Sequence, residues 1–241
     1  MPHTQGTFMD RTESILARLR SQANPSNIAG MARYGISTNN TLGVSMPVLR
    51  ALAKEIGRDH ELALSLWSSG IHEARILAGL IDDPRLVTET QMEQWVADFD
   101  SWDVCDQVCS NLFDATPFAY EKAVTWACRK EEFVKRAGFA FMAALSVHVK
   151  KAGDDTFEPF FTLIVRESTD GRNFVKKAVN WAVRQIGKRN ALLNTRAIAV
   201  AEKVQMVDAP SARWIAADAL RELTGEKVQS RLNDRKKSPP Y

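Results

Sequence analysis

The residues with the most chemical potential are a tryptophan and a carboxylate on one short segment, residues 101–112. Its apolar residues recur at helical spacing and are Val104, Cys105, Val108, Cys109 and Leu112. Ser101 is suited to cap the first turn, and Asp103 suits the positive end of the helix dipole. Trp102 and Asp106 are four residues apart, so a helix places both on one face, at the margin of the apolar stripe. A tryptophan beside a carboxylate and outside the packing face indicates a functional pair.

A second candidate cluster lies on residues 173–188. The core stripe of this predicted helix is formed by Val175, Ala178, Val179, Ala182, Val183 and Ile186. Trp181 lies on the opposite face, within a row of three cations. These cations are Lys177, Arg184 and Lys188. An aromatic ring among cations is an arrangement that binds a phosphate backbone and stacks on a nucleoside. The alternative is that the edge of Trp181 covers a neighbouring helix.

Further polar and aromatic residues carry less signal. Arg136 lies off the apolar stripe of residues 132–145, where an exposed arginine is usually just solvated. Trp214 is also off its stripe, and both surface packing and ligand contact remain open for it. His72 has no His or Cys partner at metal-ligand spacing, so a capping or loop-bridging role is favoured over catalysis. The tryptophans that fall among apolar neighbours, and are therefore predicted to be core, are Trp67, Trp95 and Trp126.

Composition places the chain among globular proteins. With 241 residues and 45% hydrophobic content, it can bury a large core. No run of 18 apolar residues is present, so no membrane span is expected, and the first residues do not resemble a secretory signal. Three cysteines, Cys105, Cys109 and Cys128, lack a zinc-like framework and are predicted to be reduced core thiols of a cytoplasmic protein.

Charge is distributed unevenly along the chain, although the net charge is only +3. Residues 1–120 carry 9 basic and 15 acidic side chains, whereas residues 121–241 carry 23 basic and 14 acidic ones. The halves therefore have net charges of −6 and +9. This asymmetry is compatible with an ordinary solvated surface, but it also suits a protein that grips a polyanion along one side.

Helical periodicity dominates, and strand signals are almost absent. Helices are expected at about residues 12–22 and 48–56, with a short segment ending at residues 31–34. From residue 61 onward, apolar helices alternate with second helices that start near His72, Ser101, Glu132, Asn173 and Ser211. These intervals of 29, 31, 41 and 38 residues predict an all-α fold, an α-solenoid of HEAT-like antiparallel helix pairs, curved with a concave basic face. Residues 1–228 are predicted to form one domain, followed by a flexible basic tail, residues 229–241.

With these residues in place, the chain resembles the AlkD-type DNA alkylation repair family of HEAT-like-repeat DNA glycosylases. The matching pieces, in order, are residues 31–34, 42–47, 102–106, 134–137 and 174–181. The resemblance implies that Asp106 is catalytic and that Trp102 and Trp181 flank the lesion-bearing nucleotide. It further implies that Arg136 binds DNA and that Tyr34 lies nearby. Residues 35–41 are more polar than this family would suggest, and the Cys105–Cys109 pair suggests a separate branch.

The implied reaction is hydrolysis of the N-glycosidic bond of an N3- or N7-methylpurine in duplex DNA. An alkylated purine is already cationic and leaves without a general acid, so Asp106 would stabilise the positive charge that develops on the sugar. Lys177, Arg184 and Lys188 would hold phosphates without reading sequence. No metal or cofactor is required, and no lysine is suited to a Schiff base, so no lyase activity is expected. We expect a monomer that acts on double-stranded DNA with alkylated bases, in the cytoplasm and at the nucleoid.

The alternative function is a non-catalytic HEAT-like module that binds DNA, branched DNA or a protein. In that case the cations would contact phosphates alone, and Asp106 would be structural.

Overall fold

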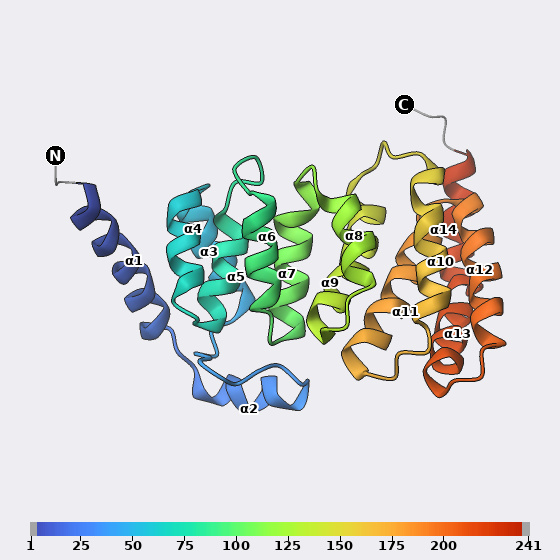
Figure 1. Cartoon of the computed structure of the whole chain (residues 1–241), viewed down its shortest axis with the longest axis horizontal. Helices are drawn as coiled ribbons and strands as arrows, with labels where there is room; N and C mark the ends of the chain where they lie inside the picture. Colours follow the sequence, from blue (N-terminus) through green and yellow to red (C-terminus); the bar gives the residue numbers. More distant parts are fainter. Residues whose placement is uncertain (1–3, 238–241) are drawn as a thin grey trace. The chain divides into compact units, whose positions relative to one another are not determined.

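The computed structural model describes residues 4–237, which form fourteen α-helices and two short 3-10 helices and contain no strand (Figure 1). The chain divides into two compact units, Met1–Thr116 and Pro117–Tyr241. Because residues 117–120 carry no charge, unit 1 has the net charge of −6 and unit 2 that of +9. Within residues 4–237, no helix has the length and apolarity that crossing a membrane would require.

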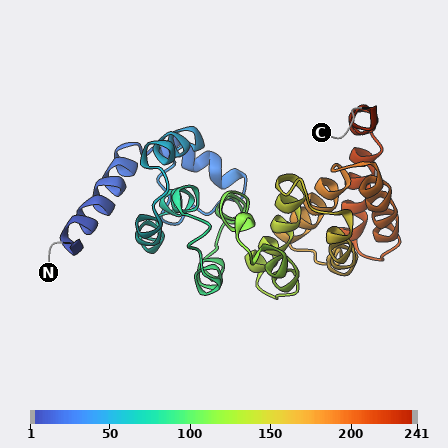
Figure 2. The same ribbon diagram turned by 90° about the horizontal axis from the view of Figure 1, so that it is seen from above.

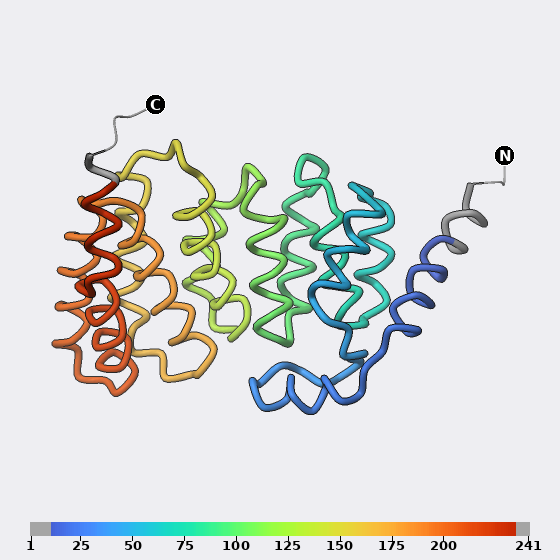
Figure 3. The backbone as a smooth tube through the Cα atoms, turned by 180° about the vertical axis from the view of Figure 1, so that it is seen from behind, coloured from blue at the N-terminus to red at the C-terminus, as the bar shows by residue number. Residues whose placement is uncertain are grey.

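Unit 1 is a row of antiparallel helices with one helix set apart. Its elements are α1 (Thr4–Ser21), α2 (Pro25–Arg33), α3 (Met46–Ile56), α4 (His60–Ser68), α5 (His72–Ile81), α6 (Glu89–Ala97), α7 (Trp102–Asn111) and the 3-10 helix η1 (Phe113–Ala115). Helix α5 packs against α3, α4 and α7. Helix α2 lies crosswise to this row in the front and back views (Figures 1 and 3), and none of its residues is buried.

The core of unit 1 contains two of the tryptophans predicted to be buried. Trp67 and Trp95 stack with ring centroids 3.9 Å apart and an interplanar angle of 4°. Phe99 meets Trp67 edge-on at 6.0 Å. The exposed fractions of Trp67 and Trp95 are 4% and 3%, so the predicted core position is confirmed for both tryptophans. Aromatic pairs of this kind stabilise a core by about 0.5–1.5 kcal/mol beyond the area they bury.

Unit 2 is a two-layered stack of helix pairs. Its elements are α8 (Ala119–Ala127), α9 (Glu132–His148), the 3-10 helix η2 (Asp154–Phe157), α10 (Glu158–Glu167), α11 (Asn173–Gly187), α12 (Ala191–Gln205), α13 (Pro210–Leu223) and α14 (Glu226–Lys237). The pairs are α8 with α9, α10 with α11 and α12 with α13. Helices α9, α11 and α13 form one layer, and α8, α10 and α12 form the other, as the view along the helix axes indicates (Figure 2).

Close packing in unit 2 follows from small residues at helix contacts. A Cβ atom added to Gly138 on α9 would lie 2.4 Å from the backbone nitrogen of Ala127 on α8, so only glycine permits this approach. Trp126 is buried beside it with 1% exposure, which confirms its predicted core position. The pairing of helices in repeats confirms the predicted all-α, HEAT-like class. Curvature and a concave basic face stay predictions.

Helix boundaries agree with the sequence analysis in the repeats and differ at the ends. The predicted second helices begin at or within a residue of the expected positions. The first helix begins earlier than expected, at Thr4, because residues 4–11 continue the helix without an interruption. Helix α14 covers most of the segment expected to be a flexible tail, and Leu232 on it is buried at 3% exposure. Residues 238–241 of that tail lie outside the described part of the chain.

The three cysteines do not share one environment. Cys105 and Cys109 are buried on α7, as predicted. Burial raises the pKa of the Cys109 thiol well above its usual value, so it stays protonated. The prediction of a core position is wrong for Cys128, which is exposed at the end of α8, with its Sγ atom 2.9 Å from an Arg166 nitrogen. The apolar spacing of α8 ends at Ala127, so Cys128 lies beyond the buried stripe.

Candidate functional site

The predicted pair on α7 is in place in unit 1. Trp102 is the first residue of α7, and Asp106 follows one turn later; both are partly exposed. On a helix, side chains four apart are neighbours, with Cβ atoms about 5–6 Å from each other. The indole Nε1 of Trp102 donates to the backbone oxygen of Tyr34 at 3.1 Å. Unit 1 therefore brings together three of the predicted site residues, Tyr34, Trp102 and Asp106.

Tyr34 ends α2 and is 76% exposed, the highest value among the aromatic side chains described. It belongs to the α2 arm, which we define as residues 24–45. The arm is joined at its base by hydrogen bonds from Asn24 N to Leu42 O, 2.8 Å, and from Asn27 Nδ2 to Gly43 O, 2.8 Å. Gly43 has φ +77°, and a Cβ there would lie 2.2 Å from the Asn24 carbonyl oxygen. The closing of the arm thus requires glycine.

The N-terminus of α7 is fixed by side chains rather than by the cap that the sequence predicted. Ser101 is the N-cap residue, but its hydroxyl makes no bond to a helix amide. Instead, its Oγ donates to Asp103 Oδ1 at 2.6 Å and accepts from the backbone nitrogen of Ser37 at 3.1 Å. The predicted capping bond is wrong because this hydroxyl is already engaged by the neighbouring loop of the α2 arm.

His72 has the loop-bridging role that the sequence favoured. Its ring Nε2 is 2.8 Å from Asp103 Oδ2, and its backbone nitrogen donates to Asn40 O at 3.0 Å. Burial lowers the pKa of His72, but the hydrogen bond and charge of Asp103 outweigh it, and the pKa lies above its ordinary value. Burial raises the pKa of Asp103, but the bond to His72 outweighs this effect and lowers the pKa. Both directions indicate an ion pair.

Glu73 is a functional candidate that sequence reasoning missed. Its side chain is buried, with 1% exposure. Its Oε1 accepts from the backbone nitrogens of Gly43 and Val44 at 2.6 and 3.2 Å, and its Oε2 accepts from that of Leu42 at 2.9 Å. A buried carboxylate needs such donors, because an unpaired charge in a core is strongly destabilising. The available signal was a glutamate at a core-facing position at the start of a helix that is apolar after Arg75.

The second predicted cluster lies on α11 in unit 2, and its charges are partly neutralised. Trp181 is partly exposed and Lys177 is exposed. Arg184 and Lys188, however, each lie 2.6 Å from a carboxylate oxygen of Glu222 on α13. Burial raises the pKa of Glu222, but Lys188 and Arg184 outweigh this effect and lower it below its usual value. The predicted row of three cations is therefore weaker in net charge than the α11 sequence alone indicated.

Arg136 is the second difference from expectation in unit 2. Its side chain is buried, with 6% exposure, and its Nη1 donates to the backbone oxygen of Phe174 at 2.7 Å. The exposed position that the helical projection indicated is wrong, because the start of α11 packs over this part of α9. The ring of Phe174 also stacks on Phe133 of α9 at 5.5 Å.

Trp214 has a surface contact in the structure. It is 40% exposed, and the Nζ atom of Lys176 lies 5.2 Å from the ring centroid. This cation–π contact joins α13 to α11 at the surface of unit 2.

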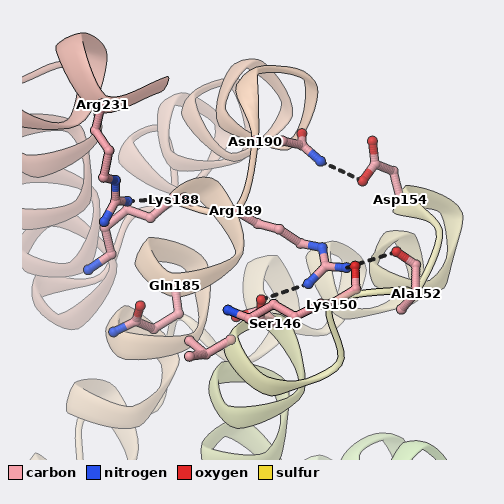
Figure 4. A pocket seen from close by; sticks show the side chains of 10 residues that line it. Ser146, Lys150, Ala152, Asp154, Gln185, Lys188, Arg189, Asn190 and Arg231 are labelled. Carbon is pink, nitrogen blue, oxygen red and sulfur yellow. Dashed lines mark hydrogen bonds between the residues drawn. The ribbon is translucent and has the colours of Figure 1, made fainter. Parts of the chain in front are cut away.

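A pocket of about 590 Å³ opens in unit 2 at the ends of α9 and α11 (Figure 4). Lys188 is the one predicted site residue that lines it. The guanidinium of Arg189 donates to four backbone oxygens, those of Ser146, Val149, Lys150 and Ala152, at 2.8–3.0 Å. Its plane also lies over Phe157, 4.8 Å from the ring centroid. Arg189 therefore closes the loop after α9, and its charge offsets the carbonyl end of that helix.

Paired helices in repeats, with a tryptophan and a carboxylate on one exposed face, define a HEAT-like-repeat protein with a candidate site on α7. The sequence matches the family of DNA alkylation repair enzymes over residues 15–223. The chain belongs to this family. Among curated proteins, none matches the sequence.

Four chains of solved structures match this one, among them the following two. The first represents a family of proteins related to the HEAT-like repeat DNA glycosylases with affinity for branched DNA structures. It is 19% identical, with a TM-score of 0.74, over 91% of this chain and 95% of that one. The second is a designed armadillo repeat protein in complex with a (KR)4 peptide, 14% identical, with a TM-score of 0.37 over 78% of this chain and 80% of that one. At these identities the first likeness shows the fold, which agrees with the HEAT-like class.

Proposed function

We propose that the protein is a DNA repair glycosylase that hydrolyses the N-glycosidic bond of cationic alkylated purines, N3- and N7-methylpurines, in duplex DNA. The observation that carries the proposal is the partly exposed carboxylate of Asp106, one turn beyond Trp102 on α7. Membership of the DNA alkylation repair enzyme family supports it.

The chemistry requires little from the protein. Alkylation gives the purine a positive charge, so the base leaves as a neutral molecule when the bond between its nitrogen and C1′ breaks. Positive charge then moves to the deoxyribose, and a nearby carboxylate stabilises it. Asp106 would also orient the water whose oxygen bonds to C1′, with its proton released to solvent. The products are the free base and an abasic site, without strand cleavage.

The two tryptophans are proposed as binding residues. A cationic base over an indole face gains on the order of 1–2 kcal/mol when the contact is desolvated. The bond from Trp102 to the Tyr34 carbonyl fixes the indole plane at the start of α7. Trp181, partly exposed on α11, is the corresponding candidate of unit 2.

The basic residues of unit 2 are proposed to contribute unequally. Lys177 is exposed and is proposed to contact a phosphate. Arg184 and Lys188 share Glu222, so each would add less to the affinity for DNA. Arg136 is proposed to act on DNA through its support of the first turn of α11 at Phe174. The partner is double-stranded DNA, bound by a monomer.

The test is single-turnover excision of 7-methylguanine from duplex DNA. Asp106→Asn keeps the size of the side chain but removes its charge, and the excision rate should fall by about 100-fold or more. Asp155→Asn, at an exposed aspartate of unit 2, removes the same charge and should leave the rate unchanged. Equal rates for Asp106→Asn and wild type would remove Asp106 from the mechanism. Uracil, a neutral and poor leaving group, should not be excised.

A second candidate function is a non-catalytic module that binds branched DNA. It is favoured by the likeness to the family with affinity for branched DNA structures. Binding to duplexes and to four-way junctions of equal length, at one salt concentration, distinguishes the two functions. Tight junction binding together with no excision of any alkylpurine would favour the second.

A further inference from the structure

The α2 arm is an unusual part of unit 1 in both charge and packing. Residues 24–45 contain one charged side chain, Arg33, in a unit whose net charge is −6. No residue of α2 is buried, so the helix gains little from apolar packing. The arm carries the exposed Tyr34 whose carbonyl receives the Trp102 indole. The position of α2 beside α7 is therefore set by contacts other than burial of its own side chains.

Polar groups on α5 and at the start of α7 hold the arm. Glu73 on α5 accepts the amides of residues 42–44. His72, the residue before Glu73 on α5, contacts the arm through its backbone N–H, which donates a hydrogen bond to Asn40 O. Ser101, at the start of α7, accepts the Ser37 amide. Asp103 joins the last two anchors, since one of its oxygens binds Ser101 and the other binds His72.

We propose that Glu73, His72 and Asp103 are positioning residues that hold residues 37–44 of the α2 arm and thereby set Tyr34 against Trp102. The effect on excision rests on the proposed function; the effect on the arm does not. Hydrogen bonds are directional, whereas apolar contacts are not, so these anchors specify one arrangement of the arm. A buried carboxylate and a buried ion pair are otherwise weak sources of stability, since apolar side chains of similar volume often serve as well.

The molecule supplies a matched control for His72. His60 Nδ1 lies 2.6 Å from Asp82 Oδ1, so unit 1 contains a second His–Asp pair. That pair joins the start of α4 to the end of α5, and none of its hydrogen bonds reaches residues 37–44. His60→Gln therefore removes a His–Asp hydrogen bond from the same unit without loosening the arm.

The experiment measures amide hydrogen exchange and single-turnover excision on the full chain. His72→Gln should speed exchange of the Ser37 amide by at least about tenfold, because its acceptor, Ser101 Oγ, is bonded to the Asp103 carboxylate that His72 holds. It should also lower the single-turnover rate of 7-methylguanine excision by about tenfold with little change in duplex affinity. His60→Gln should leave both amide exchange in residues 37–44 and the excision rate at their wild-type values. Asp103→Asn should lower the excision rate, whereas Asp103→Glu, which keeps the charge, should retain most of the wild-type rate.

Glu73→Gln tests the Glu73 anchor separately, so the inference can still be tested if the His72 variant does not fold. The amide keeps the shape and one acceptor, so residues 42–44 should exchange faster while helices α8–α13 of unit 2 keep wild-type protection. Wild-type exchange in residues 37–44 of both His72→Gln and Glu73→Gln would overturn the inference. Faster exchange with an unchanged excision rate would also overturn it. If the wild type excises no alkylpurine, the proposed function fails, and exchange in residues 37–44 alone decides whether these residues hold the arm.

Discussion

Two aspartates on α7 occupy different chemical settings, although they are three residues apart. Both oxygens of Asp103 are engaged, one by Ser101 and the other by His72. The negative charge of Asp103 is therefore paired with His72 and is not available to stabilise positive charge on a deoxyribose. Asp106 lies one turn further along, partly exposed on the face that carries Trp102. At the scale of single residues, these contacts give Asp103 a structural role, and Asp106 is the carboxylate that we propose for the chemistry.

The tryptophans give a prediction at the same scale. Trp102→Ala and Trp181→Ala should each lower the rate of 7-methylguanine excision by roughly tenfold, which corresponds to a lost cation–π contribution of about 1–2 kcal/mol. Trp102→Phe keeps an aromatic face but loses the bond to the Tyr34 carbonyl, so its rate should lie between those of wild type and Trp102→Ala. Trp214→Ala removes an exposed indole from α13 of unit 2 and is the control. Wild-type rates for both alanine variants would remove the rings from the site.

At the scale of elements, the sequence predicted what one helix determines by itself. Apolar spacing located the second helices and the side-by-side placement of Trp102 and Asp106. It could not show that Glu222, 38 residues after Arg184, would neutralise the cations of α11, because that pairing depends on how α11 packs against α13. The same limit applies to Arg136, which α11 covers, and to Glu73, whose partners are backbone amides of a loop.

The His72–Asp103 pair predicts how the stability of α5 and α7 depends on pH. The pKa of His72 is raised, so its contribution is fully present below its ordinary value of about 6.5 and is lost as pH rises through the higher folded value. The pKa of Asp103 is lowered, so its contribution is present above about 3.9 and is lost as pH falls through the folded value. The pair should therefore stabilise most between about pH 4 and 6.5.

The measurement is urea unfolding of wild type and His72→Gln across pH. At pH 6 the variant should be less stable by about 1.5–3 kcal/mol, the range for a hydrogen bond between charged groups. The difference should narrow as pH rises to about 9, because the wild-type histidine then loses its proton. A difference that is constant across this range would show that His72 is neutral in the folded protein.

At the scale of the whole molecule, the charges of the two units give a prediction for DNA affinity. If unit 2 grips phosphates, affinity should fall steeply with salt and depend little on sequence. Lys177→Ala should weaken binding to every duplex and flatten the logarithmic salt slope by about one unit.

Glu222→Gln should strengthen binding to every duplex and steepen the salt slope, since it releases Arg184 and Lys188 from their shared carboxylate. Glu202→Gln on α12 removes the same charge from an exposed position of unit 2 and controls for net charge. Equal affinities for the two glutamine variants would show that Arg184 and Lys188 do not contact DNA, and an affinity insensitive to salt would exclude a phosphate-binding surface.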